Sequence, residues 1–341
     1  MTKKLLLGST ALVGAFALAT PAFADIEVTL SGQVEFGFSA GDEDAVDSDS
    51  NRGYFFFMDS ETKIQAEGAA DNGVNYSAKV ELEVDADEDG GDVNADEAVL
   101  AFWGGFGRVE LGREDGAADN MFVGGEDFQA GTGGIDGDPV NLNVPGVADS
   151  GDAAKITYFT PRVGGFQLGG SFAPDEEGED SSENGSDDDA GEVEEQFELG
   201  ANWTGSFSGA DVTLTAVTTQ GDAEVAGEDD REDYGVGGGV EFGGLGIGAG
   251  YIFKEDRDEG DGFTVGAKYG FGPANVSVGY SYNDPDDDDD SNVLAFSGDY
   301  GVFPGVTLKG DIAFNSDDTD TGVAGDRDST TAGVVTIQID Y

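Results

Sequence analysis

Carboxylates dominate the side-chain chemistry that this sequence can perform. The chain carries 72 aspartate and glutamate residues against 15 lysine and arginine residues, which gives a formal net charge of -57. With no histidine and no cysteine, it has no Ser-His-Asp triad, no cysteine nucleophile and no thiolate or imidazole metal site. Pairs of carboxylates for acid–base catalysis could be chosen almost anywhere, so no pair is informative. The negative charge also excludes binding to nucleic acid through its phosphates.

One acidic run has the spacing of a calcium-binding loop. Asp85, Asp87, Asp89 and Gly90 fit the pattern D-x-D-x-D-G, and Asp96 stands at the twelfth position, where an EF-hand has glutamate. The flanking segments alternate as strands do, which excludes the helix-loop-helix of an EF-hand. Two interpretations stay open: a hairpin tip that binds calcium through Asp85, Asp87, Asp89 and Asp96, or a solvated acidic loop. No other cofactor is required.

Some segments alternate between polar and apolar residues, and the position of the basic residues in these segments follows a rule, which we call the parity rule. Where polar and apolar residues alternate, the basic residue falls on the polar side, as it does for Lys63, Lys79, Arg108, Lys155, Lys268 and Lys309. A charge on a lipid-facing side would cost about 2–4 kcal/mol near the bilayer centre, so avoidance of lipid explains this parity by itself. Arg113 differs, because its parity matches that of Val109 and Leu111.

The elements that must position these residues are strands of about ten residues. In residues 26–38 apolar and polar side chains alternate, and a helix would scatter the apolar ones around its axis. The same pattern with a period of two recurs at 74–84, 263–269, 274–282, 306–314 and 335–341. These segments are therefore expected to be half-buried strands.

Two kinds of connection alternate between the strands. Seven are short and glycine-rich: 69–73, 104–105, 161–165, 205–209, 243–244, 270–273 and 301–305. Eight are acidic and mostly longer: 41–51, 85–96, 114–152, 175–194, 221–231, 255–260, 284–290 and 316–328. Together they join sixteen strands, which predicts an all-β fold, a 16-stranded antiparallel up-and-down transmembrane β-barrel with short periplasmic turns and long acidic extracellular loops. The last strand can then pair with the first, which leaves no exposed edge.

The first residues have the pattern of a cleaved targeting segment. Lys3 and Lys4 precede an apolar run that ends in an A-x-A-like cleavage site at Ala24. We therefore expect residues 1–24 to be a signal peptide and residues 25–341 to form a single barrel, with 13 basic against 72 acidic residues and a charge of -59. After Ala24 no apolar stretch reaches the roughly 18 residues of a membrane-spanning helix, so only a closed barrel could cross a bilayer.

Four segments together carry a family resemblance. They are DIEVTLSGQVEFGF at 25–38, EAVLAFWGGFGRVELGR at 97–113, KITYFTPRVGGF at 155–166 and GVVTIQIDY at 333–341. In this order, after a signal peptide, they resemble the general porins of Gram-negative outer membranes, and more closely the alphaproteobacterial type. The resemblance implies an outer-membrane barrel in contact with lipid and lipopolysaccharide, a homotrimer, and a third loop folded inside the barrel. Tyr341 departs from the phenylalanine that usually ends these proteins.

The resemblance also implies a constriction. The family places a basic wall opposite carboxylates of the in-folded third loop, which here is the longest connection, 114–152. Opposed charges of this kind set up a transverse field that orients dipolar solutes. Carried over to this chain, the basic wall comprises Lys63, Lys79, Arg108, Arg113 and Lys155. The acidic side comprises Glu114, Asp115, Asp119, Glu126, Asp127, Asp136 and Asp138.

The function that these features favour is passive diffusion. We expect a general porin that passes small hydrophilic solutes and ions and favours cations, which the acidic charge concentrates within a screening length of about 8 Å. The alternative is an acidic calcium-binding cell-surface β-protein without a pore. In a membrane channel, the alternate residues of each strand that face lipid carry almost no charge, whereas a soluble β-sandwich tolerates charges on its outer face. In this sequence the corresponding residues are nearly free of charge. An enzyme in a barrel scaffold ranks last, because no nucleophile or base constellation is recognisable.

Overall fold

Sixteen strands make up most of the structure, a computed structural model. It describes residues 26–41, 53–84, 93–137, 145–147, 150–175, 193–225, 228–256, 259–285, 290–317 and 328–341. The strands are β1 Glu27–Gly41, β2 Tyr54–Ala69, β3 Asn75–Val84, β4 Val93–Gly104, β5 Gly107–Arg113, β6 Ala154–Phe159, β7 Phe166–Asp175, β8 Val193–Phe207, β9 Ala210–Ala223, β10 Arg231–Phe242, β11 Leu245–Asp256, β12 Gly260–Phe271, β13 Ala274–Pro285, β14 Ser291–Phe303, β15 Val306–Asp317 and β16 Asp328–Asp340. In the described part of the segment between β5 and β6 there are three short helices, α3 Ala117–Met121, η1 Glu126–Phe128 and η2 Gly134–Asp136.

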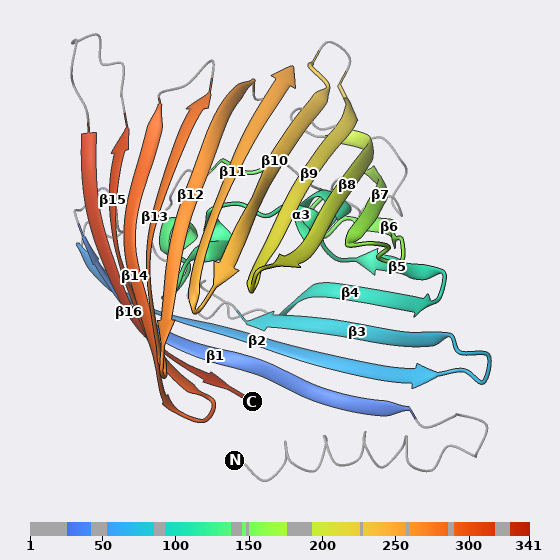
Figure 1. The fold of residues 1–341 in the computed structure, drawn as a ribbon, viewed down its shortest axis with the longest axis horizontal. Coiled ribbons are helices and arrows are strands. Elements are labelled where there is room, and N and C mark those ends of the chain that lie inside the picture. Colours follow the sequence, from blue (N-terminus) through green and yellow to red (C-terminus); the bar gives the residue numbers. More distant parts are fainter. Residues whose placement is uncertain are drawn as a thin grey trace.

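Each strand pairs antiparallel with its neighbours in the chain, and the sheet closes into a barrel (Figure 1). The closing pair is β1 with β16, in register from Gln33 opposite Asp340 to Gly41 opposite Ala332. Closure satisfies the backbone groups at both sheet edges, as a bilayer requires. The predicted sixteen-stranded up-and-down barrel is therefore confirmed. Among the described residues, no helix is long and apolar enough to cross a membrane.

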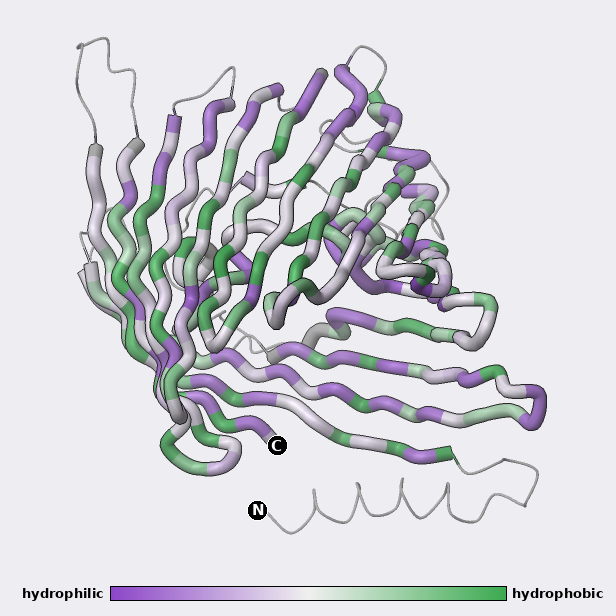
Figure 2. Tube along the Cα trace, viewed as in Figure 1, coloured by the Kyte–Doolittle hydropathy of each residue, from purple (hydrophilic) through white to green (hydrophobic). Residues whose placement is uncertain are grey.

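The outer face of the barrel is apolar, and the inner face is polar. Along β1, Phe36 and Phe38 are exposed on the outside, whereas Glu35 and Ser39 are buried within the barrel. Figure 2 shows the same alternation of hydrophobic and hydrophilic residues along the other strands. Outward aromatic residues gather near both ends of the strands, as in the two interfacial girdles of membrane barrels. Those near the loops include Tyr54, Phe56, Phe197, Tyr251 and Phe314, and those near the tight turns include Phe166, Phe207, Phe242, Tyr269 and Phe303.

The tight turns use glycine where the backbone needs a positive φ. Gly243 and Gly244, which join β10 to β11, have φ values of 58° and 86°. Two consecutive positive φ values are what a two-residue hairpin turn of type I′ requires, and its twist matches that of the strands. Side chains with a Cβ would be strained at both positions, so this glycine pair determines the register of the hairpin.

The third long connection turns into the barrel. The chain leaves β5 at Arg113 and returns at Ala154, and β5 and β6 are the shortest strands, with 7 and 6 residues. In Figure 1 the described residues of this segment, with α3, lie inside the ring of strands. We call residues 114–153 the inner loop. Its path inside the barrel agrees with the prediction, whereas β4 begins at Val93, within the connection expected at 85–96.

Candidate functional site

The inner loop is held against the barrel wall by hydrogen bonds from its own backbone. The N–H of Ala117 donates to Ser171 Oγ at 2.7 Å, and the N–H of Ala118 donates to Glu198 Oε2 at 2.9 Å. Further along, the Val123 N–H donates to Thr215 Oγ1 at 3.2 Å. A loop inside a barrel cannot bond to a neighbouring strand, so hydroxyl and carboxylate groups of the wall satisfy its backbone instead.

Side chains of the wall also accept hydrogen bonds from the backbone in the second half of the inner loop. The N–H groups of Gly125 and Ala130 donate to hydroxyl groups of β12 and β13, Thr264 Oγ1 and Ser277 Oγ, each at 2.8 Å. Thr132 donates from its backbone and its hydroxyl to Asp311 Oδ2 on β15, at 2.7 and 2.8 Å. The loop is thus fastened step by step from β7 to β15.

Glycines on the inner face give the loop room to lie flat. On β10 and β11, Gly239 and Gly248 both face the ring of Phe128, and a Cβ at either position would overlap that ring. On β12, a Cβ at Gly266 would overlap the carbonyl oxygen of Gly125. At these three positions the wall has no side chain, so the loop can approach the wall closely. In residues 235–239 and 246–250, every inward position is a glycine. These glycines are a sequence signal for the path of the inner loop, which the positions of the charged residues alone do not reveal.

Two small apolar clusters complete the docking. Ala118 and Met121 of α3 pack with Val217 of β9, with Phe122 and Phe159 partly buried against them. Ile135 of η2 is fully buried with Val293, Ala295 and Ala313 of β14 and β15. Burying such side chains contributes about 1.5–3 kcal/mol each for the larger ones, so the loop is an integral part of the interior.

The docking leaves one arc of the wall uncovered. Among the described residues, α3 packs on β6 to β9, η1 on β11 to β13, and η2 on β13 to β15. None of the three helices packs on β16 or on β1 to β5. We call this arc, β16 with β1 to β5, the open wall. The passage through the barrel runs between the inner loop and the open wall.

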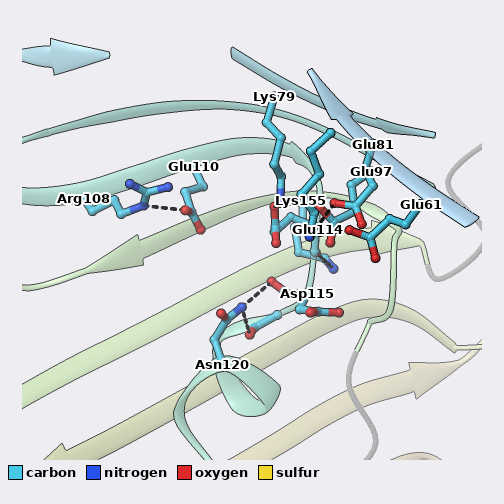
Figure 3. Close-up of polar contacts among 12 residues, drawn as sticks. Glu61, Lys79, Glu81, Glu97, Arg108, Glu110, Glu114, Asp115, Asn120 and Lys155 are labelled. Atoms are coloured by element: carbon cyan, nitrogen blue, oxygen red, sulfur yellow. Dashed lines mark hydrogen bonds and ion pairs between the residues drawn. The ribbon is translucent and has the colours of Figure 1, made fainter. Parts of the chain in front are cut away.

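Basic residues on the open wall are paired with carboxylates of the same wall (Figure 3). Lys63 Nζ lies 2.9 Å from Glu61 Oε1 and 3.1 Å from Glu81 Oε2. Lys63 thus bridges a carboxylate of its own strand and a carboxylate of β3. Lys63 is already neutralised locally and does not stand as an isolated positive charge opposite the loop.

Lys79 is the basic residue that joins the wall to the inner loop. Its ammonium pairs with Glu97 of β4 and lies 2.5 Å from Glu114 Oε2, at the start of the loop. Lys155, at the beginning of β6, is buried and donates to the backbone carbonyls of Glu114 and Gly151. The structure thus brings together three predicted site residues, Lys79, Lys155 and Glu114, at the point where the chain enters the barrel.

Arg108 and Arg113 differ in orientation. Arg108 faces inward, where its Nε donates to Glu110 Oε1 at 2.5 Å and its guanidinium lies 5.2 Å from the centre of the Trp103 ring. Arg113 is in register with Ala98 and Ala154, which are outward positions on β4 and β6. Its parity in the strand is therefore that of the outer face.

The carboxylates predicted for the loop side are spread along the inner loop. Asp115 adjoins Glu114, and Asp119 is exposed on α3. Glu126 and Asp127 belong to η1, where Glu126 Oε2 accepts from Thr264 Oγ1 at 2.6 Å and Asp127 Oδ2 accepts from the Gly124 N–H at 2.8 Å. The first bond holds η1 on β12, and the second lies within the inner loop. Asp136 is the last residue of η2, and Asp138 lies outside the described residues.

Carboxylates that could hold a metal gather at the loop entrance. Glu97, Glu114 and Asp115 offer oxygen atoms within 4.8 Å of one another, although Lys79 already pairs with the first two. Of the calcium set predicted at the hairpin tip, Asp96 is described in β4, whereas Asp85, Asp87 and Asp89 lie outside the described residues. That calcium site therefore stays a prediction.

Two carboxyl groups at the loop entrance have raised pKa values. Burial raises the pKa of Glu114, and Lys79 acts in the opposite direction. For Asp152, burial raises the pKa, and the neighbouring charges of Asp96 and Asp115 add to the effect. Both groups therefore bind protons at a higher pH than ordinary carboxylates do.

Sequence reasoning missed several residues of this site, chiefly inward acids such as Glu61, Glu81, Glu97, Glu110 and Glu198. The parity rule that sorted the basic residues would have placed these acids on the inner face as well. It could not have identified Glu198 as the anchor of the inner loop. Glu198 is 1% exposed, and its Oε1 accepts from the Ser150 N–H at 3.0 Å and from Ser150 Oγ at 2.6 Å.

Replacing Glu198 by alanine should release the beginning of the inner loop. The change leaves the N–H of Ala118 and both donors of Ser150 without their acceptor, at about 1–3 kcal/mol for each buried group. We expect proteases to cleave the detergent-solubilised Glu198→Ala variant within residues 114–150 markedly faster than the parent. Glu198→Gln, which keeps an acceptor oxygen, should be cleaved more slowly than the alanine variant. Equal cleavage of parent and Glu198→Ala would contradict this anchoring role.

Comparison with known proteins agrees with this architecture. A family profile described as Gram-negative porin matches residues 8–320. A triple mutant of the Rhodopseudomonas blastica porin superposes with a TM-score of 0.65 at 18% identity, over 92% of this chain and 100% of that one. The anion-selective porin from Comamonas acidovorans gives a TM-score of 0.67 at 19% identity, over 93% and 100%. No curated protein sequence matches this chain.

Identities this low show that the fold is shared, whereas the family profile covers most of the chain. Porins are diffusion channels of the outer membrane, and the apolar exterior and polar interior of this barrel suit that place. The resemblance inferred from four sequence segments is thereby confirmed, and the chain belongs to the family of Gram-negative porins.

Proposed function

We propose that this outer-membrane channel passes small hydrophilic solutes and ions with a preference for cations. The observation that carries the proposal is the excess of carboxylates on the open wall. The inward basic residues of β1 to β5 are Lys63, Lys79 and Arg108. The inward carboxylates of the same strands include Glu35, Asp59, Glu61, Glu81, Glu83, Glu97 and Glu110.

The pairing pattern makes this excess effective. Lys63 and Lys79 each contact two carboxylates, so neither lysine presents an uncompensated positive charge to the passage. Glu35 pairs with Lys309 of β15 at 2.8 Å, so this carboxylate is balanced. A narrow passage with low-dielectric walls focuses such a field and raises the local cation concentration. The fold itself does not determine the sign, because the similar Comamonas acidovorans structure is described as anion-selective.

Reversal potentials in a KCl gradient test this preference. The parent channel in a planar bilayer should favour potassium over chloride, and the double variant Glu97→Gln/Glu110→Gln should lower that ratio by up to about fivefold. The estimate follows because one unit charge about 4 Å away in water is worth about 1 kcal/mol. Glu232→Gln is the matched control, since Glu232 lies at an outward position of β10. An anion-selective parent, or an equal change in the control, would refute the proposal.

The preference for cations should weaken in mild acid. Because the pKa values of Glu114 and Asp152 are raised, these carboxylates take up protons as the pH falls, while ordinary carboxylates are still charged. The permeability ratio should therefore begin to decline at a pH above 4.5, the ordinary value for glutamate. The variant Glu114→Gln/Asp152→Asn should lack this early phase of the titration. An identical titration curve in the parent and the double variant would rule out these groups as its source.

We also propose that the barrel assembles as a homotrimer through the outer face of β1 and β2, while lipid and lipopolysaccharide cover the remainder. In the middle of β2, Ser60 and Thr62 face outward beside Gly32, and Thr62 Oγ1 shares a hydrogen bond of 2.7 Å with Tyr341 Oη. Small and polar side chains suit contact between protein surfaces better than contact with lipid tails. Sedimentation in detergent should give the mass of three chains, and Ser60→Trp should reduce it. A monomeric parent would exclude the trimer.

A further inference from the structure

A groove crosses the outer face of the barrel, away from the proposed contact between subunits. It has a volume of about 470 Å³ and is lined by residues of four neighbouring strands, β7 to β10. In the closed ring these strands are separated from β1 and β2 by β3 to β6 on one side and by β11 to β16 on the other. The groove therefore lies on the part of the surface that lipid covers.

Small side chains form the floor of this groove. Ala201 of β8 is in register with Ala216 of β9, and Thr218 is the next outward residue along β9. Four larger outward side chains surround this floor, two in register with the alanines and two in register with Thr218: Leu168, Val236, Leu199 and Tyr234. The depression thus results from three small residues among large ones on the same face.

The size and chemistry of the groove suit one hydrocarbon chain. Adjacent strands of a sheet lie about 4.8 Å apart, so four strands span roughly 14 Å. This length is close to the roughly 15 Å that one leaflet contributes to the hydrocarbon core of a bilayer. Among the described side chains that line the groove, Thr218 and Tyr234 alone carry a polar atom. A lipid tail is therefore the occupant that fits it.

The loop end of the groove is negatively charged. Tyr234 Oη donates to Glu232 Oε2 at 3.1 Å, so this carboxylate lies beside the groove, toward the loop end of β10. Glu232 is in register with Glu255 of β11, and both side chains are at outward positions. Among the described residues, neither glutamate has a basic partner. Because like charges directly opposite each other destabilise a strand pair, a positive group between them would be stabilising.

We propose that the groove binds one acyl chain of a lipid whose head group carries an amine. The tail lies over Ala201 and Ala216, and the ammonium group lies beside Glu232 and Glu255. The two glutamates are at the loop ends of their strands, where the apolar band of a membrane barrel gives way to the polar interface. A purely anionic head group would be repelled there. This inference goes beyond solute passage, and it rests on the proposed function only in that lipid covers this face.

Native mass spectrometry in a neutral detergent tests the choice of head group. The probes are myristoyl lysophosphatidylethanolamine and myristoyl lysophosphatidylglycerol, which share a tail and differ in the amine. The parent should retain the ethanolamine lipid about two- to fivefold better, the effect expected of one unit charge a few ångströms away in water. Glu232→Gln/Glu255→Gln should still bind the tail but lose this preference. Equal retention of both lipids by the parent, or an unchanged preference in the double variant, would overturn the proposal.

Filling the groove tests its location. Ala216→Trp places a large ring on the floor and should abolish retention of both lysolipids. Ala267→Trp is the matched control, since Ala267 is an outward residue of β12 between Ile247 and Val278, and it should retain them as the parent does. Equal retention by the two variants would overturn the assignment. A change in the number of chains per particle in Ala216→Trp alone would identify a contact between copies of the chain and would overturn it as well.

Conductance in KCl separates this inference from the proposed channel function. All three variants change the outer face, so each should conduct as the parent does, which also shows that it has folded. A parent that conducts and retains neither lysolipid would overturn the lipid site alone. A parent that does not conduct would instead refute the proposed channel function.

Discussion

The structure depends on one constraint, which is that a backbone in hydrocarbon must find all of its hydrogen-bond partners within the protein. Closure of β16 on β1 meets this constraint for the sheet. Closure also gives a distribution of side chains opposite to that of a soluble protein. The apolar side chains of each strand face outward, and the polar side chains face a wet interior. Charged residues of the strands, such as Lys79 and Glu198, owe their inward positions to this alternation.

The same constraint acts a second time inside the barrel, on the inner loop. Its backbone has no strand neighbour, so hydroxyl and carboxylate side chains of the wall take the place of a ladder, from Ser171 on β7 to Asp311 on β15. Glycines on β10 to β12 let the two backbones approach closely. Because the loop rests on one side of the wall, the passage is displaced toward the open wall, and the charges of that wall line it.

The fold could be predicted from sequence because a period of two is a local signal, repeated in every strand from Ile26 onward. The candidate site was predictable only in part. Parity placed Lys63 and Lys79 on the inner face, but their partners depend on register: Lys79 meets Glu114 because β3 passes the point where the chain leaves β5. The path of the inner loop depends on contacts between residues far apart in sequence, such as that of Thr132 with Asp311, and no local pattern encodes these.

The docking of the inner loop also bears on how the barrel is assembled. The loop is fastened to β7 through β15, whereas the seam between β1 and β16 lies in the arc on which none of its helices packs. A curved, still open sheet can therefore carry the loop already in place before its two edges meet. Formation of the last strand pair then requires no threading of the loop through a finished ring, because the seam lies away from the docked helices.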